Sequence, residues 1–127
     1  MNLKVLLIDD DEIILLMHDL MIIESGLSNT TIGFESCMAA LTFLENQHNQ
    51  DERYLIFLDI HMPEMSGWQF LDTIQASPYK DRVSVVVTTS SIDSADHIMS
   101  RKYPAVTEYI EKPMTAEIFS RIKQRYA

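Results

Sequence analysis

Short apolar runs alternate with amphipathic stretches along most of the chain. Five runs have the length and the β-branched content of buried strands, and they cover residues 4–8, 30–34, 54–58, 83–89 and 105–110. The stretch that follows each run repeats apolar side chains at helical spacing. Strand and helix thus alternate five times, which predicts an α/β domain with a parallel sheet and right-handed crossovers.

The helical stretches have recognisable ends and core-facing stripes. Asp11 is a candidate N-cap and Gly26 a candidate C-terminal stop for the first helix, and Ser36 is a candidate cap for the second. The fourth helix, over 94–102, is only modestly amphipathic, and the polar segment 46–53 is predicted to be a surface loop. The expected core-facing residues of the other helices are Ile13, Leu16, Met17, Leu20 and Met21, then Cys37, Ala40, Leu41 and Leu44, then Trp68, Phe70, Leu71 and Ile74, and in the last helix, from about 115, Ile118, Phe119 and Ile122.

Polar side chains stand where the predicted strands end. Asp9 and Asp10 follow the first strand, Asp59 ends the third, Thr89 the fourth, and Lys112 follows the fifth. The carboxyl ends of parallel strands meet at one edge of a sheet, where such sheets bind ligands. A lone acid at a strand end is more often a simple loop cap, but this convergence favours a functional site.

Composition narrows the function further. The 127 residues fit one domain, 1–127, with no output domain, and 46% are hydrophobic and 23% charged. We expect a cytoplasmic protein, because no apolar run could span a bilayer and no signal peptide precedes the first strand. One cysteine excludes an internal disulfide and disfavours a zinc site. The net charge of −9 argues against binding nucleic acid and suits either cation binding or simple solubility.

The convergent residues have complementary chemistry. Gathered carboxylates repel one another unless they bind protons or share a cation, and oxygen ligands favour Mg²⁺ or Mn²⁺. With such a cation, Lys112 and Thr89 could each hold an oxygen of a phosphoryl group. Asp59 would then attack in line, and the product would be an aspartyl phosphate.

These segments resemble the receiver domain of two-component response regulators from end to end. The matching pieces are Leu7-Ile8-Asp9-Asp10, Leu58-Asp59-Ile60-His61-Met62-Pro63-Glu64-Met65-Ser66-Gly67, Val87-Thr88-Thr89-Ser90-Ser91 and Tyr109-Ile110-Glu111-Lys112-Pro113. The resemblance implies a flavodoxin-like five-stranded sheet with strand order 2-1-3-4-5. It also implies a cis peptide bond between Lys112 and Pro113.

The resemblance assigns roles to individual residues. It implies that Mg²⁺ is held by Asp10, Asp59 and the backbone carbonyl of His61, with Asp9 acting mainly through water. The switch residues would be Tyr109 and a threonine, for which Thr89 is preferred over Thr88 because Thr89 precedes the small Ser90. His61 and Ser91 would tune hydrolysis of the phosphoryl group, although His61 is equally well interpreted as a solvated loop residue.

The sequence therefore predicts a stand-alone receiver that accepts a phosphoryl group on Asp59 from a phosphohistidine of a histidine kinase or phosphotransfer protein. It would signal through phosphorylation-dependent binding of a protein that the sequence does not identify, as a monomer or a weak phosphorylation-dependent dimer. We expect no enzymatic activity beyond its own phosphorylation and dephosphorylation.

One alternative is a Mg²⁺-dependent phosphatase with an aspartyl-phosphate intermediate. Against it, this chain has no second acid two residues after Asp59 and no room for a cap domain. Another is a fragment of a hybrid kinase, against which Met1 argues mildly.

The first helix has more apolar side chains than one core-facing stripe needs. Ile14, Leu15, Ile22 and Ile23 fall outside the predicted stripe. Either Ile14 and Leu15 dock a helix of the phosphodonor, or the helix is buried on more than one side.

Overall fold

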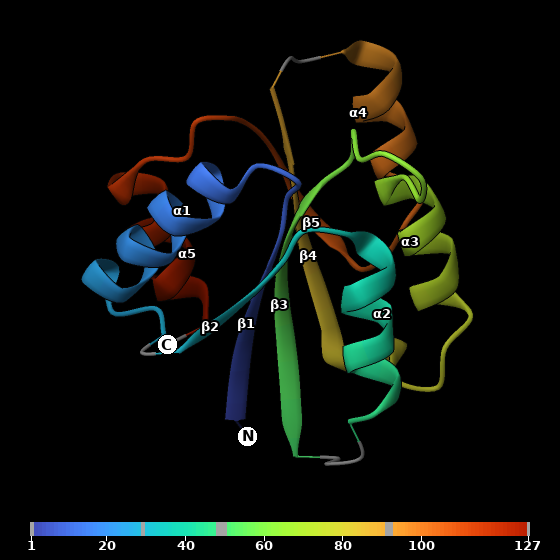
Figure 1. Cartoon of the computed structure of the whole chain (residues 1–127), viewed down its shortest axis with the longest axis horizontal. Coiled ribbons are helices and arrows are strands. Elements are labelled where there is room, and N and C mark those ends of the chain that lie inside the picture. The colour runs from blue at the N-terminus through green and yellow to red at the C-terminus, as the bar shows by residue number, and fades with distance from the viewer. Residues whose placement is uncertain (1, 29, 48–50, 91–92, 127) are drawn as a thin grey trace.

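A five-stranded parallel sheet forms the centre of the molecule, and helices cover both of its faces (Figure 1). The computed structural model describes residues 2–28, 30–47, 51–90 and 93–126. The strands are β1 (Asn2–Ile8), β2 (Thr31–Phe34), β3 (Glu52–Asp59), β4 (Val83–Thr89) and β5 (Val106–Glu111). The helices are α1 (Glu12–Ser25), α2 (Cys37–Glu45), α3 (Gly67–Gln75), α4 (Ser94–Ser100) and α5 (Ala116–Tyr126), with a 3₁₀ turn, η1 (Lys80–Arg82), before β4.

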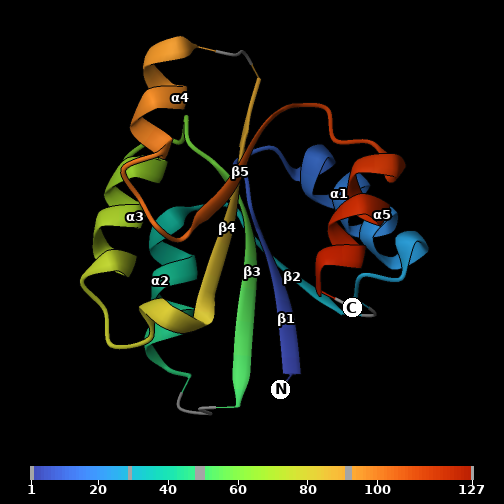
Figure 2. The same ribbon diagram turned by 180° about the vertical axis from the view of Figure 1, so that it is seen from behind.

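The sheet order is β2-β1-β3-β4-β5 and all neighbouring strands are parallel, so the predicted class and strand order are confirmed. The helices α1 and α5 cover one face, while α2, α3 and α4 lie on the other, as the views from front and back agree (Figures 1 and 2). Among the described residues, no helix is long and apolar enough to cross a bilayer.

Two apolar layers, one on each face, hold the helices to the sheet. Val5 and Leu7 pack with α1 and α5, whereas Leu6 and Ile8 pack with α2 and α3. Successive side chains of a strand point to opposite faces, so an apolar run without polar interruptions suits a strand that is covered on both sides. This explains why the core strands could be predicted from the sequence.

Most helix ends and stripes follow the prediction. The Asp11 carboxylate accepts from the backbone N–H of Ile13 at 2.9 Å, Gly26 ends α1 with φ of 80°, and Ser36 caps α2. The apolar stripe of α2 is buried as expected, and the buried side chains of α3 and α5 include most of those predicted, namely Phe70, Leu71, Ile74, Phe119 and Ile122. Trp68 and Ile118 are half-buried.

The predicted core-facing stripe of α1 is wrong. Four of its five members are exposed, Ile13, Leu16 and Leu20 by 67%, 60% and 58% and Met17 by 40%, and Met21 alone packs partly against the core. The buried side chains are Ile22 and His18. Because α1 is apolar on almost every side, its periodicity does not select one stripe, and its packing against α5 decides which side faces inward.

Two further predictions change. The polar segment 46–53 is not a loop throughout, because Glu52 and Arg53 begin β3 and pair with Asn2 and Leu3 of β1. Glu52 is buried there, accepts a hydrogen bond from the Tyr54 hydroxyl at 3.0 Å and lies 3.1 Å from Lys4 Nζ. The fourth helix ends at Ser100, two residues before the predicted end.

Candidate functional site

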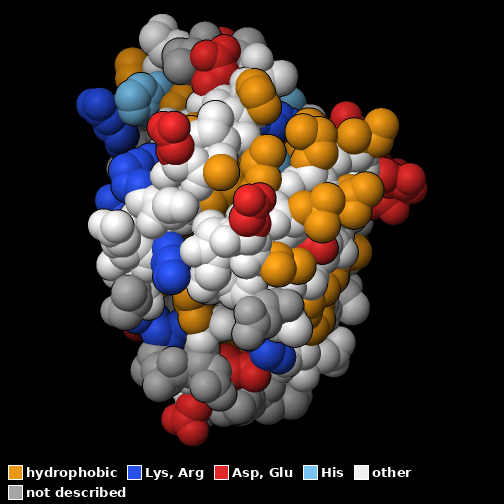
Figure 3. Space-filling view, turned by 90° about the vertical axis from the view of Figure 1, so that its left-hand side faces the viewer, with side chains coloured by type: hydrophobic (Ala, Val, Ile, Leu, Met, Phe, Trp, Pro, Cys, Tyr) orange, Lys and Arg blue, Asp and Glu red, His pale blue; other side chains and the backbone are white. Residues whose placement is uncertain are grey.

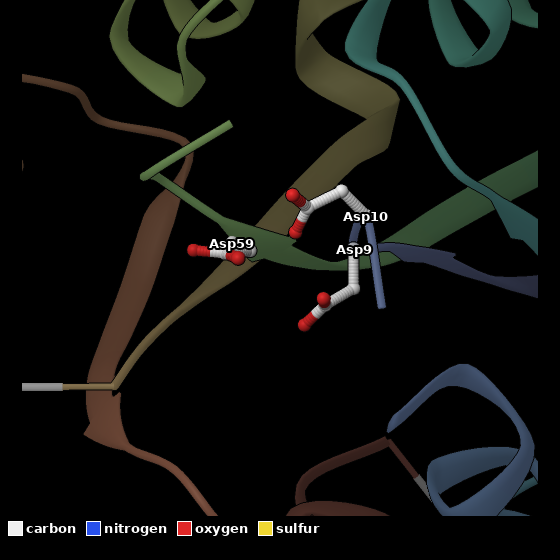
Figure 4. A group of neighbouring side chains, drawn as sticks. All are labelled: Asp9, Asp10 and Asp59. Carbon is white, nitrogen blue, oxygen red and sulfur yellow. The ribbon is translucent and has the colours of Figure 1, made fainter. Parts of the chain in front are cut away.

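The site lies where β1 and β3 end side by side. These strands pair in register up to Ile8 and Leu58, so the next residues, Asp9 and Asp59, come out at the same sheet edge. Both carboxylates are buried, with 4% and 5% of the residue exposed, while Asp10 is exposed. Oxygens of Asp9, Asp10 and Asp59 all lie within 4.8 Å of one another, and Figure 4 shows the three side chains gathered at the strand ends.

Lys112 enters this acidic group from the segment after β5. Its Nζ lies 2.8 Å from Asp9 Oδ2 and 3.3 Å from Asp59 Oδ2. Its backbone N–H donates to the carbonyl of Thr89 at 2.6 Å, which ties the segment to the end of β4. Burial lowers the pKa of the ammonium, but the carboxylates of Asp9 and Asp59 outweigh burial and leave the pKa above its usual value. The Lys112–Pro113 peptide bond is cis, as predicted.

The Asp59 carboxylate is held by backbone as well as by Lys112. The N–H of His61 donates to Asp59 Oδ1 at 3.0 Å, and the N–H of Asp11 donates to Asp9 Oδ1 at 2.9 Å. Burial raises the pKa of Asp59 above its ordinary value, although the His61 N–H and the Lys112 charge oppose the rise. The hydrogen bond and the ammonium thus do not fully offset the burial of this carboxyl group, and a bound cation would further stabilise its ionised form.

The loop from β3 to α3 is packed tightly beneath the site. Ile60 and Met62 are buried, and the backbone N–H of Gly67 donates to the carbonyl of Ile60 at 3.1 Å. A Cβ added at Gly67 would lie 2.6 Å from Ile60 Cα, so this close approach requires glycine. Ser66 then caps α3 through a capping box with Gln69. The turn predicted to support the Asp59 loop therefore has a clear structural basis.

The end of β4 brings two hydroxyl groups to the same edge. Thr88 pairs in register with Asp59, and Thr89 with Glu111, and both threonines are buried. Consecutive strand residues face opposite sides of a sheet, so only one hydroxyl can face the phosphoryl position. The choice of Thr89 stays a prediction, and Ser91 lies outside the described residues.

Tyr109 is half-buried on β5, and its ring stacks on that of His97 in α4 with centroids 4.9 Å apart and planes 6° apart. Burial raises the pKa of its hydroxyl. That hydroxyl is shielded from solvent and meets no hydrogen-bond partner in good geometry among the described residues.

Two residues of α4 near the site were missed by the sequence reasoning. His61 Nε2 lies 3.3 Å from Asp96 Oδ2, and His97 carries the stack with Tyr109. These contacts join α4 to a loop and a strand that are distant in sequence, so no local spacing pattern could have indicated them.

Comparison with known proteins places this geometry in a family. The family model described as "Response regulator receiver domain" matches residues 5–123. A two-component response regulator from Cytophaga hutchinsonii is 26% identical, with a TM-score of 0.83 over 98% of this chain and 96% of that one. A receiver protein from Dyadobacter fermentans shares the fold, with a TM-score of 0.86, 21% identity and coverage of 98% of this chain and 97% of that one.

Curated relatives are mostly longer proteins. A protein-glutamate methylesterase/protein-glutamine glutaminase 2 of Shewanella sp. strain MR-4 is 33% identical over 116 residues, which are 89% of this chain and 30% of that protein. Response regulator Rcp1 of Synechocystis is 34% identical over 86 residues, 65% of this chain and 51% of that protein. The chain spans less than two thirds of these relatives. Fold, acidic site and family match agree, and the chain belongs to the response regulator receiver domain family.

Proposed function

We propose that this receiver domain accepts a phosphoryl group on Asp59 from a phosphohistidine of a histidine kinase or a histidine phosphotransfer protein. The observation that carries the proposal is the contact of Lys112 with both Asp9 and Asp59 beside the exposed carboxylate of Asp10. This arrangement offers one carboxylate as nucleophile, one ammonium for the phosphoryl oxygens and two further acids for a metal.

The donor set suits Mg²⁺. Asp9, Asp10 and Asp59 supply oxygen ligands at an edge where Asp10 is open to solvent, and we add the backbone carbonyl of His61. Burial, and to a smaller extent the Asp9 charge, raise the pKa of Asp59, so a divalent ion would stabilise its ionised form and would also polarise a phosphoryl oxygen.

The proposed phosphoryl transfer is an in-line displacement at phosphorus. An oxygen of ionised Asp59 forms a bond to phosphorus, the phosphorus–nitrogen bond of the donor breaks, and its electron pair stays on the donor imidazole. Lys112 moves from the two carboxylates towards the incoming phosphoryl oxygens, and the Thr89 hydroxyl donates to another. Thr89 and Tyr109 then form the switch, since a hydroxyl drawn to the phosphoryl group leaves space into which the aromatic ring can move.

The donor is proposed to dock on α1, through residues other than the Ile14 and Leu15 expected from sequence. Leu15 packs against the core and Ile14 is half-buried. The exposed apolar side chains are instead Ile13, Leu16, Met17, Leu20 and Ile23, on the side of the molecule shown in Figure 3. The helix has acidic residues and no lysine or arginine, so a donor helix with an apolar stripe and basic flanks would complement it.

An aspartyl-phosphate phosphatase remains the second candidate, because it uses the same nucleophile, hydroxyl and lysine. Receiver domains are in general signalling modules rather than enzymes, which favours the first candidate. Turnover separates the two: a receiver labelled by a small phosphodonor holds one phosphoryl group per chain and releases it slowly, whereas a phosphatase hydrolyses many phosphoesters.

Trp68 provides the direct test, because it follows Gly67 and stacks on Tyr103 with ring centroids 5.9 Å apart. Its emission should change on adding Mg²⁺, and again on adding beryllofluoride, which mimics the phosphoryl group. Asp59→Asn serves as the matched control and should abolish the second change. Beryllofluoride binding without Mg²⁺, or binding that persists in Asp59→Asn, would rule out the proposed function.

A further inference from the structure

The helix α4 is held to the domain by few buried side chains. It has seven residues, of which only Ser100 is buried, while Met99 packs partly against the core and Ile98 is 61% exposed. A helix with so little buried surface depends on individual side-chain contacts for its position, and it is the kind of element that moves at low energetic cost.

Two consecutive residues supply such contacts. Asp96 Oδ2 lies 3.3 Å from His61 Nε2 in the loop after β3, and the His97 ring stacks on Tyr109 of β5. The side chain of Asp96 is 19% exposed and that of His61 53%. The helix is thus attached on one side to the loop that carries the phosphorylation site and on the other to the sheet.

His61 contacts both the site and the helix. Its backbone N–H is bonded to Asp59 Oδ1, which fixes the main chain beside the carboxylate, while its ring extends to Asp96. The Asp96 carboxylate offers only acceptor oxygens and negative charge, which attract the imidazole nitrogen that faces it. A phosphoryl group on Asp59 would place stronger acceptor oxygens and more negative charge two residues from the same ring.

We propose that Asp96 and a phosphoryl group on Asp59 compete for the imidazole of His61, so that phosphorylation withdraws the ring from Asp96 and loosens α4. This competition rests on the proposed function. It adds a second connection between the phosphorylation site and the rest of the domain, beside the one through Thr89 and Tyr109. Asp96 acts here as a positioning residue, since it sets the resting place of the ring. Because coupling is reciprocal, the contact with Asp96 weakens binding of the phosphoryl group by the same factor by which phosphorylation weakens the contact.

Beryllofluoride affinity in wild type, in the two single variants Asp96→Asn and His61→Ala, and in their double variant tests the competition for the His61 ring. With saturating Mg²⁺ and Trp68 emission as the readout, Asp96→Asn should bind the mimic more tightly than wild type, by about fivefold or more. His61→Ala removes the ring, and in that background Asp96→Asn should alter the affinity less than about twofold. Glu111→Gln, which neutralises an exposed acid at the end of β5, controls for the general effect of one negative charge fewer.

Amide hydrogen exchange across 93–100 gives a second readout. Beryllofluoride should speed exchange of α4 in wild type, and in Asp96→Asn exchange should be fast already and change little. The proposed competition for the His61 ring is refuted if Asp96→Asn leaves the beryllofluoride affinity unchanged, or if it tightens binding equally with and without that ring. It is also refuted if beryllofluoride does not speed amide hydrogen exchange of α4 in wild type. Failure of wild type to bind the mimic with Mg²⁺ would instead refute the proposed function itself.

Discussion

Lys112 Nζ lies 2.8 Å from Asp9 Oδ2 although the two residues are 103 positions apart in sequence. The contact closes the site, because the same ammonium reaches Asp59 and both carboxylates are buried. We expect Lys112→Met to lower the free energy of unfolding by about 1–3 kcal/mol without metal, since it leaves buried carboxylates facing one another.

Urea denaturation in the presence of a chelator measures that loss, and the double variant Asp9→Asn/Lys112→Met is its control. Removing one of the two acids should restore part of the stability, and Mg²⁺ should stabilise Lys112→Met more than wild type. Equal stability of Lys112→Met and wild type under chelator would show that the ammonium does not offset the buried charge.

The orientation of α1 makes a matched pair of substitutions informative. Ile22→Ala should cost about 2–5 kcal/mol, because Ile22 is fully buried against β1 and α5. Leu16→Ala should change the free energy of unfolding by no more than about 0.5 kcal/mol, since Leu16 is 60% exposed. Both changes place alanine in the same helix, so helix propensity largely cancels. Similar costs at the two positions would contradict the orientation of the helix.

His18 should make the protein less stable in mild acid. Its side chain is buried with its ring edge-on to Phe119, and burial lowers its pKa below the usual 6.5, with Lys112 adding to the decrease and Asp9 opposing it. As the pH falls below about 6.5, His18 is therefore protonated in the unfolded chain before it is protonated in the folded one. Stability from this group is complete above about pH 6.5 and falls below it, by up to about 1.4 kcal/mol per pH unit.

His18→Met isolates this effect, because subtracting its pH profile from that of wild type removes the titration of Asp59. Urea denaturation between pH 5 and 8 should give a difference that is flat above about pH 6.5 and declines below it. A difference that stays constant over the whole range would show that His18 keeps an ordinary pKa in the folded protein.

Cys37 should be almost inert in the folded protein. Burial, with a smaller contribution from the Asp59 charge, raises the pKa of its thiol from 9.0 to about 12. At a given pH this rise in the pKa lowers the thiolate population by about a thousandfold, and the thiolate is the reactive form. Labelling by a chromogenic disulfide at pH 8 should be slower by about that factor than in urea. Asp59→Asn should label faster than wild type, and rapid labelling of native wild type would contradict the burial of the thiol.

Sequence by itself determined the sheet and the acidic site. The strands are covered on both faces, so they must be continuously apolar, and any acid, hydroxyl or lysine at their ends becomes conspicuous. Asp9, Asp10, Asp59 and Lys112 could be predicted to meet because the carboxyl ends of parallel strands share one edge. The caps at Asp11, Gly26 and Ser36 follow from backbone groups within a few residues, which local sequence specifies.

Only the tertiary structure decided which side of α1 faces inward and what holds α4. An almost wholly apolar helix has no unique stripe, so the burial of Ile22 and the exposure of Leu16 result from the packing of α1 against β1 and α5. The contact between His61 and Asp96 joins the loop after β3 to α4. These two segments are far apart in sequence, so the local pattern of residues cannot predict that their side chains meet. Long-range packing therefore set the two features on which the proposed partner surface and the proposed exchange depend.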